Sequence, residues 1–427
     1  MCSTSLKLMK KTILSQKEER DKLLSFPYQQ RYLLDTAIVF RDSHPIKLIT
    51  GPRRAGKSVL ALQMLQDNNF AYLNFDDSSL LDKFQEDSVE QALNEVYPGY
   101  EYLLLDEIQN LDGWNSWVSK LYRRGVNLII TGSNAKMLST DLATILSGRH
   151  IDLKLFPFSA KEYLQHYNVP TDNLITPVQI STINIKLDDF LHNGGYPEVI
   201  DTPKVIGSYL SGLYDSIILK DIVKRYKVRK VQELYSVASW LLSNFTNPFS
   251  VTSLTEEVGM SSANTVKKFC GYLEEVYLFQ YLSRLNNKLK LMAKADRKVY
   301  VVDNGFIEAR AFELSQNLGR LIENLVFMEL LKRGYDLKKH ELFYYRSRND
   351  RETDFVCRQK NNVEQLIQVC FDMSALKTRK REVKAIVECA KELKCHKLTI
   401  ITWNEEETIE ANGETIRVIP LWKWCQE

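Results

Sequence analysis

A glycine-rich stretch early in the chain has residue types and a spacing that suit phosphate binding. The sequence "LITGPRRAGKSVLALQML" runs from Leu48 to Leu65 and satisfies the pattern G-x-x-x-x-G-K-[ST]. Glycines let the backbone approach a ligand, the first turn of a helix presents free amides, and the lysine adds a positive charge. The alternative is a glycine turn in an ordinary α/β domain, but an apolar run precedes the motif and a helical pattern follows it. We therefore expect a nucleotide's phosphates to be bound by Gly51, Pro52, Arg53, Arg54, Ala55, Gly56, Lys57, Ser58 and Val59.

Two acidic residues follow the apolar run of "YLLLDEIQNLDGW". Asp106 would lie at the carboxyl end of a buried strand, where a carboxylate can hold Mg²⁺ together with the hydroxyl of Ser58. Glu107 follows at the position of a base that activates water. Two acids at the end of an apolar strand would be costly without a cation to meet. We therefore prefer this interpretation to the alternative of a solvated turn.

A third strand end, in "NLIITGSNAKML", carries Thr131, Ser133 and Asn134. A polar side chain there would sit between the other two strand ends, and we assign to Asn134 the role of orienting the attacking water. An ordinary strand-to-helix turn capped by a serine is the alternative.

The stretch "ILSGRHIDLKLFPF" contains Arg149, a candidate arginine finger. Such an arginine stabilises the charge that develops on phosphate during transfer, on the nucleotide of a neighbouring subunit or on its own. A surface salt bridge would explain this arginine equally well.

Short apolar runs alternate with helical patterns from residue 46 to about residue 155. The runs "IKLIT", "FAYLNF", "YEYLLLD" and "VNLIITG" each end in polar or glycine residues. This rhythm predicts a parallel sheet covered by helices, with the loop and the acidic pair at its carboxyl edge. The preceding segment, Glu18 to Ser43, is expected to form a helix beside the sheet.

The middle of the chain predicts a winged helix-turn-helix. Helices are expected over Val231–Phe245, Ser250–Val258 and Ala263–Val276, and two strand-like runs, "LFQYLSRL" and "KVYVVD", follow. The spacer between these runs, "RLNNKLKLMAKADRK", holds six Lys or Arg residues, and the third helix carries Lys267 and Lys268. These residues could contact the phosphates of DNA or RNA, or the module could dock a protein partner.

Length and composition set wide limits. At 427 residues the chain is long enough for two or three domains, and 57 basic against 54 acidic residues give a net charge of +3. This balance does not indicate a nucleic acid or membrane partner, so any basic surface must be local. Seven cysteines are scattered without metal-ligand spacing, and no apolar stretch of about 18 residues occurs. We expect a cytoplasmic protein with free thiols and no membrane partner.

Several motifs together resemble a prokaryotic AAA+ type P-loop ATPase family related to archaeal ATPases. They are "GPRRAGKS", "LLLDEIQ", "ITGSN", "LSGR", "LFPFSAKEY", "NGGYPEV" and "KDIVKR", extended by "KVYVVDNGF" and "GRLIENLVFMEL". In that family an ATP-binding domain precedes a winged helix and a C-terminal domain that resembles restriction endonucleases. The resemblance implies ATP and Mg²⁺ as cofactors, ATPase activity, and the usual roles for the loop, Asp106, Glu107, Asn134 and Arg149.

The expected fold class is α/β, with a P-loop NTPase parallel sheet that has helices on both faces. A helical and winged-helix region and a restriction-endonuclease-like α/β domain follow. The expected domains are an N-terminal helical segment at 1–44, the ATPase core at 45–155, a helical lid or linker at 156–229, the winged helix-turn-helix at 230–303 and the nuclease-like domain at 304–427.

The C-terminal domain departs from the nuclease pattern that the resemblance implies. Such nucleases gather Mg²⁺ with a helix glutamate, a strand aspartate and an E-x-K tripeptide on the next strand. Glu323 and Asp354 fit the first two positions, but Gln368 and Cys370 replace the last carboxylate and the lysine. An amide is a poor ligand for a hard cation and a thiol cannot replace an ammonium, so we expect an inactive domain kept for binding or packing. Residues that could instead rebuild a metal site are Glu352, Glu364 and Lys377.

Three functions stay open at this point. The first is an Mg²⁺-dependent ATPase whose nucleotide state moves the winged helix and the C-terminal domain. In one form of this hypothesis the protein acts on DNA. The second is a slow nucleotide-gated switch or scaffold that acts through protein partners. The third is a nuclease licensed by ATP. An oligomer is compatible with each, and an arginine finger that acts on a neighbouring subunit requires one.

Overall fold

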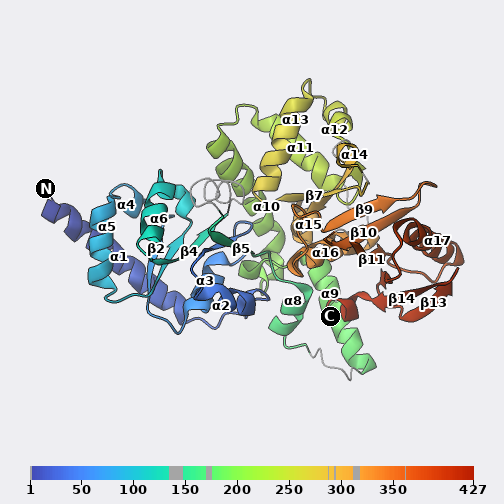
Figure 1. Cartoon of the computed structure of the whole chain (residues 1–427), viewed down its shortest axis with the longest axis horizontal. Helices are drawn as coiled ribbons and strands as arrows, with labels where there is room; N and C mark the ends of the chain where they lie inside the picture. Colours follow the sequence, from blue (N-terminus) through green and yellow to red (C-terminus); the bar gives the residue numbers. More distant parts are fainter. Residues whose placement is uncertain are drawn as a thin grey trace. The chain divides into compact units, whose positions relative to one another are not determined.

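The computed structural model describes residues 2–133, 148–169, 176–286, 288–292, 295–310, 318–360 and 362–427. The chain divides into two compact units, whose helices and strands are labelled in Figure 1. The first unit contains Met1–Pro157 and Glu275–Tyr277, and the second contains Phe158–Glu274 and Leu278–Glu427.

The first unit is built on a parallel sheet, as the sequence predicts, but the sheet has five strands and the sequence analysis names only four apolar runs. Its strands are β1 (Ile46–Thr50), β2 (Phe70–Asn74), β3 (Tyr102–Asp106), β4 (Asn127–Gly132) and β5 (His150–Lys154), in the order β2-β3-β4-β1-β5. All neighbouring pairs are parallel. The carboxyl ends of β1, β3 and β4 therefore meet at one edge of the sheet, where α/β proteins of this kind place their ligands.

Helices cover both faces of this sheet, which confirms the predicted fold class (Figure 1). On one face, α1 (Cys2–Leu24), α5 (Glu86–Val96) and α6 (Trp114–Arg123) bury apolar side chains together with the strands. On the other face, α2 (Leu34–Arg41) and α3 (Lys57–Leu65) do the same. Every residue of β1 and β3 is buried, because strands covered on both faces have no side open to solvent.

The N-terminal segment is broken, so the prediction of a helix over Glu18–Ser43 is wrong. The first helix, α1, ends at Leu24 and the second, α2, begins at Leu34. Pro27 lies between them and explains the break. A proline has no N–H to continue the helix, and it disfavours a helical backbone in the residue before it.

The second unit begins with helices and a small antiparallel sheet. The helices are α8 (Ala160–His166), α9 (Pro177–Asn193), α10 (Ile206–Ser216), the π-helix η4 (Ile217–Lys224), α11 (Val231–Ser243), α12 (Val251–Glu257) and α13 (Ala263–Glu275). The last three confirm the helices that the sequence predicts in this region. Strand β8 (Arg297–Val301) then pairs antiparallel with β7 (Phe279–Ser283) and with β6 (Pro248–Phe249). The short helix α14 (Leu289–Met292) lies in the spacer between β7 and β8.

The remainder of the second unit contains a six-stranded mixed sheet with the order β13-β14-β12-β11-β10-β9. The strands are β9 (Leu342–Arg346), β10 (Glu352–Gln359), β11 (Asn362–Val369), β12 (Leu398–Thr402), β13 (Glu407–Ala411) and β14 (Glu414–Pro420). The helices are α15 (Asn304–Arg310), α16 (Leu318–Lys332), α17 (Leu376–Leu393) and α18 (Leu421–Trp424). None of the helices within the described ranges is long and apolar enough to cross a membrane.

The apolar run "KLTIITW" forms β12, but it is not the last strand of the chain. β13 and β14 follow it and pair as a hairpin around Asn412 and Gly413, whose φ angles are 53° and 83°. Asn-Gly between two runs is a strong hairpin signal. The hydrophobic pattern misses β13 because none of its residues is fully buried.

Candidate functional site

The glycine-rich loop connects β1 to α3 at the carboxyl edge of the parallel sheet. A Cβ on Gly51 would lie 1.9 Å from the carbonyl oxygen of Leu155, so a larger residue does not fit there. Gly56 is the N-cap of α3 and has a φ of 92°, a conformation that glycine adopts without strain. The first amides of a helix have no intrahelical acceptor, so the start of α3 offers hydrogen-bond donors to an anion.

A buried arginine ties this loop to the chain around it. Arg31 is 3% exposed, and its Nη1 donates to the carbonyl oxygen of Ala55 at 2.7 Å. Its Nη2 donates to the carbonyl oxygen of Phe156, also at 2.7 Å. The loop is thereby joined to the segment after β5. Arg31 cannot be identified from the sequence, because the stretch "QQRY" belongs to no motif.

Lys57 is buried at the first position of α3. Its side chain is 4% exposed, and its Nζ donates to the carbonyl oxygen of Pro52 at 3.0 Å. The same Nζ lies 3.6 Å from Oε1 of Glu107. An ammonium has three N–H donors, so this lysine keeps capacity to bind an anion.

Asp106 ends β3 and is surrounded by hydroxyl groups. Ser58 donates to its Oδ1 at 2.9 Å and Tyr72 donates to its Oδ2 at 3.3 Å, while the hydroxyl of Thr131 also donates to Oδ1. Burial and the neighbouring Glu107 carboxylate raise the pKa of Asp106 to about 6. A cation placed here would favour the ionised carboxylate and relieve this cost.

Glu107 is held in the left-handed conformation, with φ 52° and ψ 42°, which is uncommon for a residue with a side chain. Its backbone amide donates to Oγ1 of Thr131 at 3.1 Å, and the side-chain amide of Gln109 donates to its carboxylate. Burial opposes ionisation, but Lys57 and Gln109 together lower the pKa of Glu107 below its ordinary value. The carboxylate is therefore ionised at neutral pH and can accept a proton.

These groups fit a nucleotide and a divalent cation. A serine hydroxyl and an aspartate carboxylate within hydrogen-bonding distance of each other are oxygen donors of the kind that Mg²⁺ prefers. The buried ammonium and the helix amides beside them suit phosphate oxygens. The loop, Ser58, Asp106 and Glu107 are thus brought together at the predicted edge of the sheet.

The other two predicted residues are Asn134 and Arg149. Asn134 lies outside the described residues. Arg149 lies directly before β5, which runs parallel to β1 with Ile46 opposite His150 and Thr50 opposite Lys154. Arg149 is therefore at the amino edge of the sheet, about 13 Å or more along the strands from the loop. This geometry does not suit an arginine finger on the chain's own nucleotide, so only the alternative of a neighbouring subunit's nucleotide is kept.

The two acidic positions of the second unit come together around a lysine. Glu323 of α16 and Asp354 of β10 are predicted from the sequence, and Glu352 of β10 and Lys298 of β8 join them. The Nζ atom of Lys298 lies 2.9 Å from Oε1 of Glu323, 3.1 Å from Oδ1 of Asp354 and 2.7 Å from Oε1 of Glu352. The sequence analysis misses this role of Lys298 and counts it in the basic spacer.

Gln368 and Cys370 lie beside this cluster and carry no charge. Gln368 is buried in β11, and its Oε1 accepts a hydrogen bond from the amide of Asp354 at 3.4 Å. The Cys370 thiol donates to the carbonyl oxygen of Asp372 at 3.3 Å, and burial raises its pKa to about 11. Across the described residues, no group of three or more His, Cys, Asp or Glu side chains is arranged to hold a metal ion.

The spacer expected to form a basic wing offers fewer free cations than its composition suggests. Lys298 is buried in the cluster, and the guanidinium of Arg297 lies 4.8 Å from the ring centroid of Tyr281. Arg284 donates to the carbonyl oxygen of Arg346 at 3.3 Å. Those of its basic residues that the structure describes as exposed are Lys288 and Lys290.

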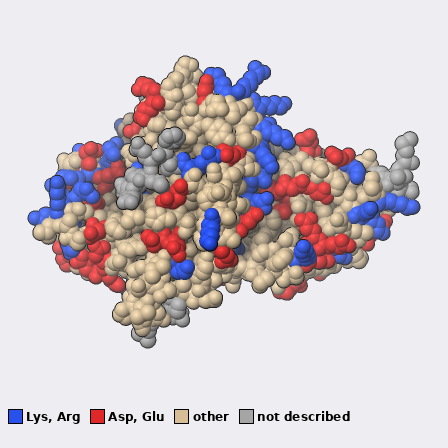
Figure 2. All heavy atoms as spheres, turned by 180° about the vertical axis from the view of Figure 1, so that it is seen from behind, with Lys and Arg blue, Asp and Glu red and all other residues tan. Residues whose placement is uncertain are grey.

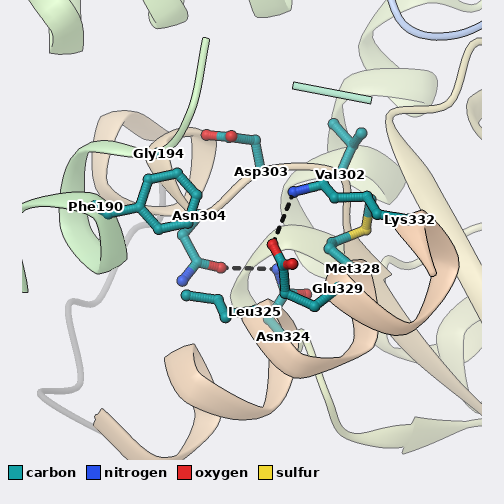
Figure 3. A pocket seen from close by; sticks show the side chains of 10 residues that line it. All are labelled: Phe190, Gly194, Val302, Asp303, Asn304, Asn324, Leu325, Met328, Glu329 and Lys332. Carbon is teal, nitrogen blue, oxygen red and sulfur yellow. Dashed lines mark hydrogen bonds and ion pairs between the residues drawn. The ribbon is translucent and has the colours of Figure 1, made fainter. Parts of the chain in front are cut away.

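A buried polar network of the second unit joins three motifs of the sequence (Figure 3). They are "NGGYPEV", "KVYVVDNGF" and "GRLIENLVFMEL". Asp303 accepts hydrogen bonds from the amides of Gly195 at 2.8 Å and Gly305 at 2.9 Å. The side-chain amide of Asn324 donates to Oδ1 of Asn304 at 2.8 Å. The cavity beside them is about 20 Å³, which is room for about one water molecule. These motifs therefore pack α9, α15 and α16 together.

Models of known protein families match the chain in three successive parts. Residues 43–164 match an AAA domain, residues 184–316 match a domain of unknown function (DUF8612), and residues 318–424 match another domain of unknown function (DUF4143). The AAA match covers the five strands of the parallel sheet, the glycine-rich loop and the acidic pair.

Similar proteins include a solved structure and two relatives without a known function. The Walker-type ATPase of Pyrococcus abyssi shares 14% identity and a TM-score of 0.46 over 66% of this chain and 95% of its own. An uncharacterized protein of Methanocaldococcus jannaschii is 31% identical over 396 residues, which are 89% of this chain and 88% of the relative. An uncharacterized protein of Haemophilus influenzae is 32% identical over 357 residues, 80% of this chain and 86% of the relative. The chain therefore belongs to the same family as these two relatives, and its first part is an AAA domain.

Proposed function

We propose that this protein is an Mg²⁺-dependent ATPase. In this proposal the loop from Gly51 to Val59 binds the phosphates, and Ser58 and Asp106 hold Mg²⁺, which neutralises charge on the outer phosphates when bound. Glu107 accepts the proton of the attacking water. The observation that carries the proposal is the 2.9 Å hydrogen bond between Ser58 and Asp106, next to the buried Lys57.

Asn134 and Arg149 keep proposed roles in hydrolysis. Asn134 orients the attacking water. Arg149 acts on the nucleotide of a neighbouring copy, because its position at the amino edge of the sheet separates it from its own loop. Its side chain is exposed, with the guanidinium 6.0 Å from the ring centroid of Tyr122. This role requires an oligomer.

The second unit is proposed to contain a winged helix-turn-helix at 230–303 and a nuclease-like domain at 304–427. The order α11, α12, α13 and the antiparallel strands β6, β7 and β8 support the first assignment. Glu323 on a helix and Asp354 on a strand support the second. The remaining proposed boundaries are an N-terminal helical segment at 1–44, the ATPase core at 45–155 and a helical lid or linker at 156–229.

We propose that the nucleotide state moves these modules through the chain at Tyr277. The hydroxyl of Tyr277 donates to Oγ1 of Thr50 at 2.8 Å, and Thr50 directly precedes Gly51 of the loop. Glu275–Tyr277 groups with the first unit, although the residues before and after belong to the second. A shift of the loop on nucleotide binding is therefore passed to the segment that joins α13 to β7.

Nucleic acid is the proposed partner of the second unit. An open cleft of about 830 Å³ is lined by Lys339, Arg358, Lys360 and Lys394, with Glu392 as the acidic residue of its lining. Such an excess of positive charge attracts the phosphate backbone in a salt-dependent way. Figure 2 shows Lys and Arg side chains interspersed with Asp and Glu, with several Lys and Arg side chains projecting near the top of the view.

The two alternative functions have less support. A slow switch or scaffold that acts through a protein partner would use the same nucleotide site, and only its rate and its partner would differ. A nuclease licensed by ATP would need a metal at Glu323 and Asp354, where Gln368 and Cys370 supply no charged group. We also propose a reducing, cytoplasmic setting, because six cysteines are free and buried.

The proposal is tested by measuring ATP turnover with and without single- and double-stranded DNA, at two salt concentrations. Turnover that needs Mg²⁺ and rises with DNA at low salt is expected, and the double change Lys360→Glu with Lys394→Glu should remove the rise but keep basal turnover. Slow turnover indifferent to DNA would favour the protein-partner switch. Absence of Mg²⁺-dependent turnover under every condition would refute the ATPase. DNA cleavage abolished by Asp354→Asn would establish the nuclease instead.

A further inference from the structure

A cluster of three carboxylates in the second unit surrounds one buried ammonium. Lys298 is 2% exposed, and each of its three contacts with Glu323, Glu352 and Asp354 is between 2.7 and 3.1 Å long. The lysine comes from β8, the first acid from α16 and the other two from β10. All four side chains are therefore carried by regular elements of one unit.

Hydrogen bonds from other groups hold the carboxylates in place. Tyr300 donates to Oε1 of Glu323 at 2.8 Å, Arg346 donates to Oε2 of Glu352 at 2.8 Å, and the amide of Val369 donates to Oδ2 of Asp354 at 2.9 Å. The oxygens that face Lys298 are thus fixed before any external ligand arrives. As they stand, these oxygens converge on the ammonium, and among the described residues they are not arranged to hold a metal ion.

The charges around the lysine are nearly balanced without a metal. Lys298 and Arg346 supply two positive charges, and Glu352 and Asp354 supply two negative charges. Burial and the nearby Asp354, opposed by Lys298, raise the pKa of the third acid, Glu323, to about 7. Burial disfavours the ammonium, but the surrounding carboxylates raise the pKa of Lys298 well above its ordinary value. The ammonium is therefore permanently charged at neutral pH.

We propose that the Lys298 ammonium takes the place of a divalent cation at this cluster, so that the second unit has a cation site filled by its own chain. The ammonium donates hydrogen bonds to Glu323 and Asp354 and forms an ion pair with Glu352. The lysine fastens β8 to α16 and β10, and it keeps a catalytic metal from the acids that a nuclease would need. This inference does not depend on ATP binding by the first unit.

The proposal predicts that a metal site appears when the ammonium is removed. Lys298→Ala leaves three carboxylates around an empty space, so the variant should bind about one Mn²⁺ per chain and melt at a higher temperature with Mn²⁺ than without. Adding Asp354→Asn should weaken this binding about tenfold or more. Lys298→Met, which fills the space without a charge, should bind no Mn²⁺ there.

Mn²⁺ binding is measured by calorimetric titration of nucleotide-free protein. Every protein tested also carries Asp106→Asn, because Asp106 is the acid proposed to hold metal in the first unit. Wild-type Lys298 in this background should show no Mn²⁺ binding that depends on Asp354. If it does bind Mn²⁺ in that way, Lys298 is a neighbour of a working metal centre and the proposal is overturned. If Lys298→Ala folds only when Mn²⁺ is present, the proposal is supported; if it folds and ignores Mn²⁺, the proposal fails.

Discussion

Each unit contains a buried lysine near acidic side chains, but of these two only the lysine of the first unit keeps capacity to bind an anion. Lys57 has one carboxylate, at 3.6 Å, and one carbonyl oxygen, at 3.0 Å. Lys298 has three carboxylates within 3.1 Å. The first begins a helix after a glycine loop, where backbone amides are also free to bind an anion. The second lies in a strand packed between other elements.

The acids differ in the same way. Asp106 is surrounded by hydroxyl groups, and burial and Glu107 raise its pKa to about 6. A cation bound beside it would favour the ionised form of this carboxylate. Asp354 and Glu352 already have the ammonium of Lys298 between them. Asp106, the proposed Mg²⁺ ligand, is thus contacted by hydroxyl groups, whereas Asp354 and Glu352 share one ammonium.

The largest effect on ATP turnover is expected from Glu107→Gln in the first unit. This change keeps the shape of the side chain but removes the proposed base, so ATP binding should persist while turnover falls about 10²–10⁴-fold. Single-turnover hydrolysis and calorimetric binding separate the two effects. Glu101→Gln, an exposed change in the same unit, should alter neither, and parental turnover in Glu107→Gln would show that another group is the base.

The next effect concerns the uncompensated charge of Asp106. Its raised pKa means that the folded protein holds this proton more tightly than the unfolded chain. The contribution of Asp106 to stability is therefore fully present below about pH 4 and is lost as pH rises through about 6. Asp106→Asn removes this loss and should stabilise nucleotide-free protein at pH 7.5 by about 1–3 kcal/mol. Urea unfolding in EDTA at pH 4.5 and 7.5 measures the difference. An equal gain at both pH values would contradict the assigned pKa.

A smaller effect is expected from Ser58→Ala. Removal of the hydroxyl takes away one proposed Mg²⁺ ligand, so affinity for ATP with Mg²⁺ should fall about tenfold while affinity for ATP in EDTA stays unchanged. The matched control is Ser119→Ala, because the buried hydroxyl of Ser119 has no hydrogen-bond partner among the described residues. Equal losses with and without Mg²⁺ would assign Ser58 a role in packing alone.

The smallest effect is expected from Tyr277→Phe, which removes the hydrogen bond to Thr50. The loss should be about 1 kcal/mol of stability, and the response of ATP turnover to DNA should weaken if Tyr277 passes the nucleotide state along the chain. Tyr196→Phe is the control, since the hydroxyl of Tyr196 has no partner within the described part of the chain. Full DNA stimulation in Tyr277→Phe would remove this residue from the proposed route.

The sequence predicts the site at the glycine-rich loop better than the cluster around Lys298. Gly51, Gly56 and Lys57 follow one another at fixed spacing, and strands rich in apolar residues deliver Asp106 and Glu107 to the same edge of a parallel sheet. These are local patterns, so they can be found without a structure. Arg31 escapes such a search because its contacts with Ala55 and Phe156 join segments far apart in the chain.

The cluster in the second unit shows the limit of sequence patterns. Glu323 and Asp354 are found by their places on a helix and a strand, but Lys298 lies 25 residues before the first and 56 before the second. In the sequence it belongs to a basic spacer, and only the fold buries it among acids. Similarly, Arg149 lies in a promising motif, but the parallel pairing of β5 with β1 takes it to the far edge of the sheet.

The most direct test of the account is a calorimetric titration with ATP and Mg²⁺ of three proteins: the wild type, Lys57→Ala and Glu323→Gln. We expect that the wild type binds one nucleotide per chain, that Lys57→Ala loses this binding and that Glu323→Gln keeps it unchanged. No binding by the wild type, or undiminished binding by Lys57→Ala, would contradict the account.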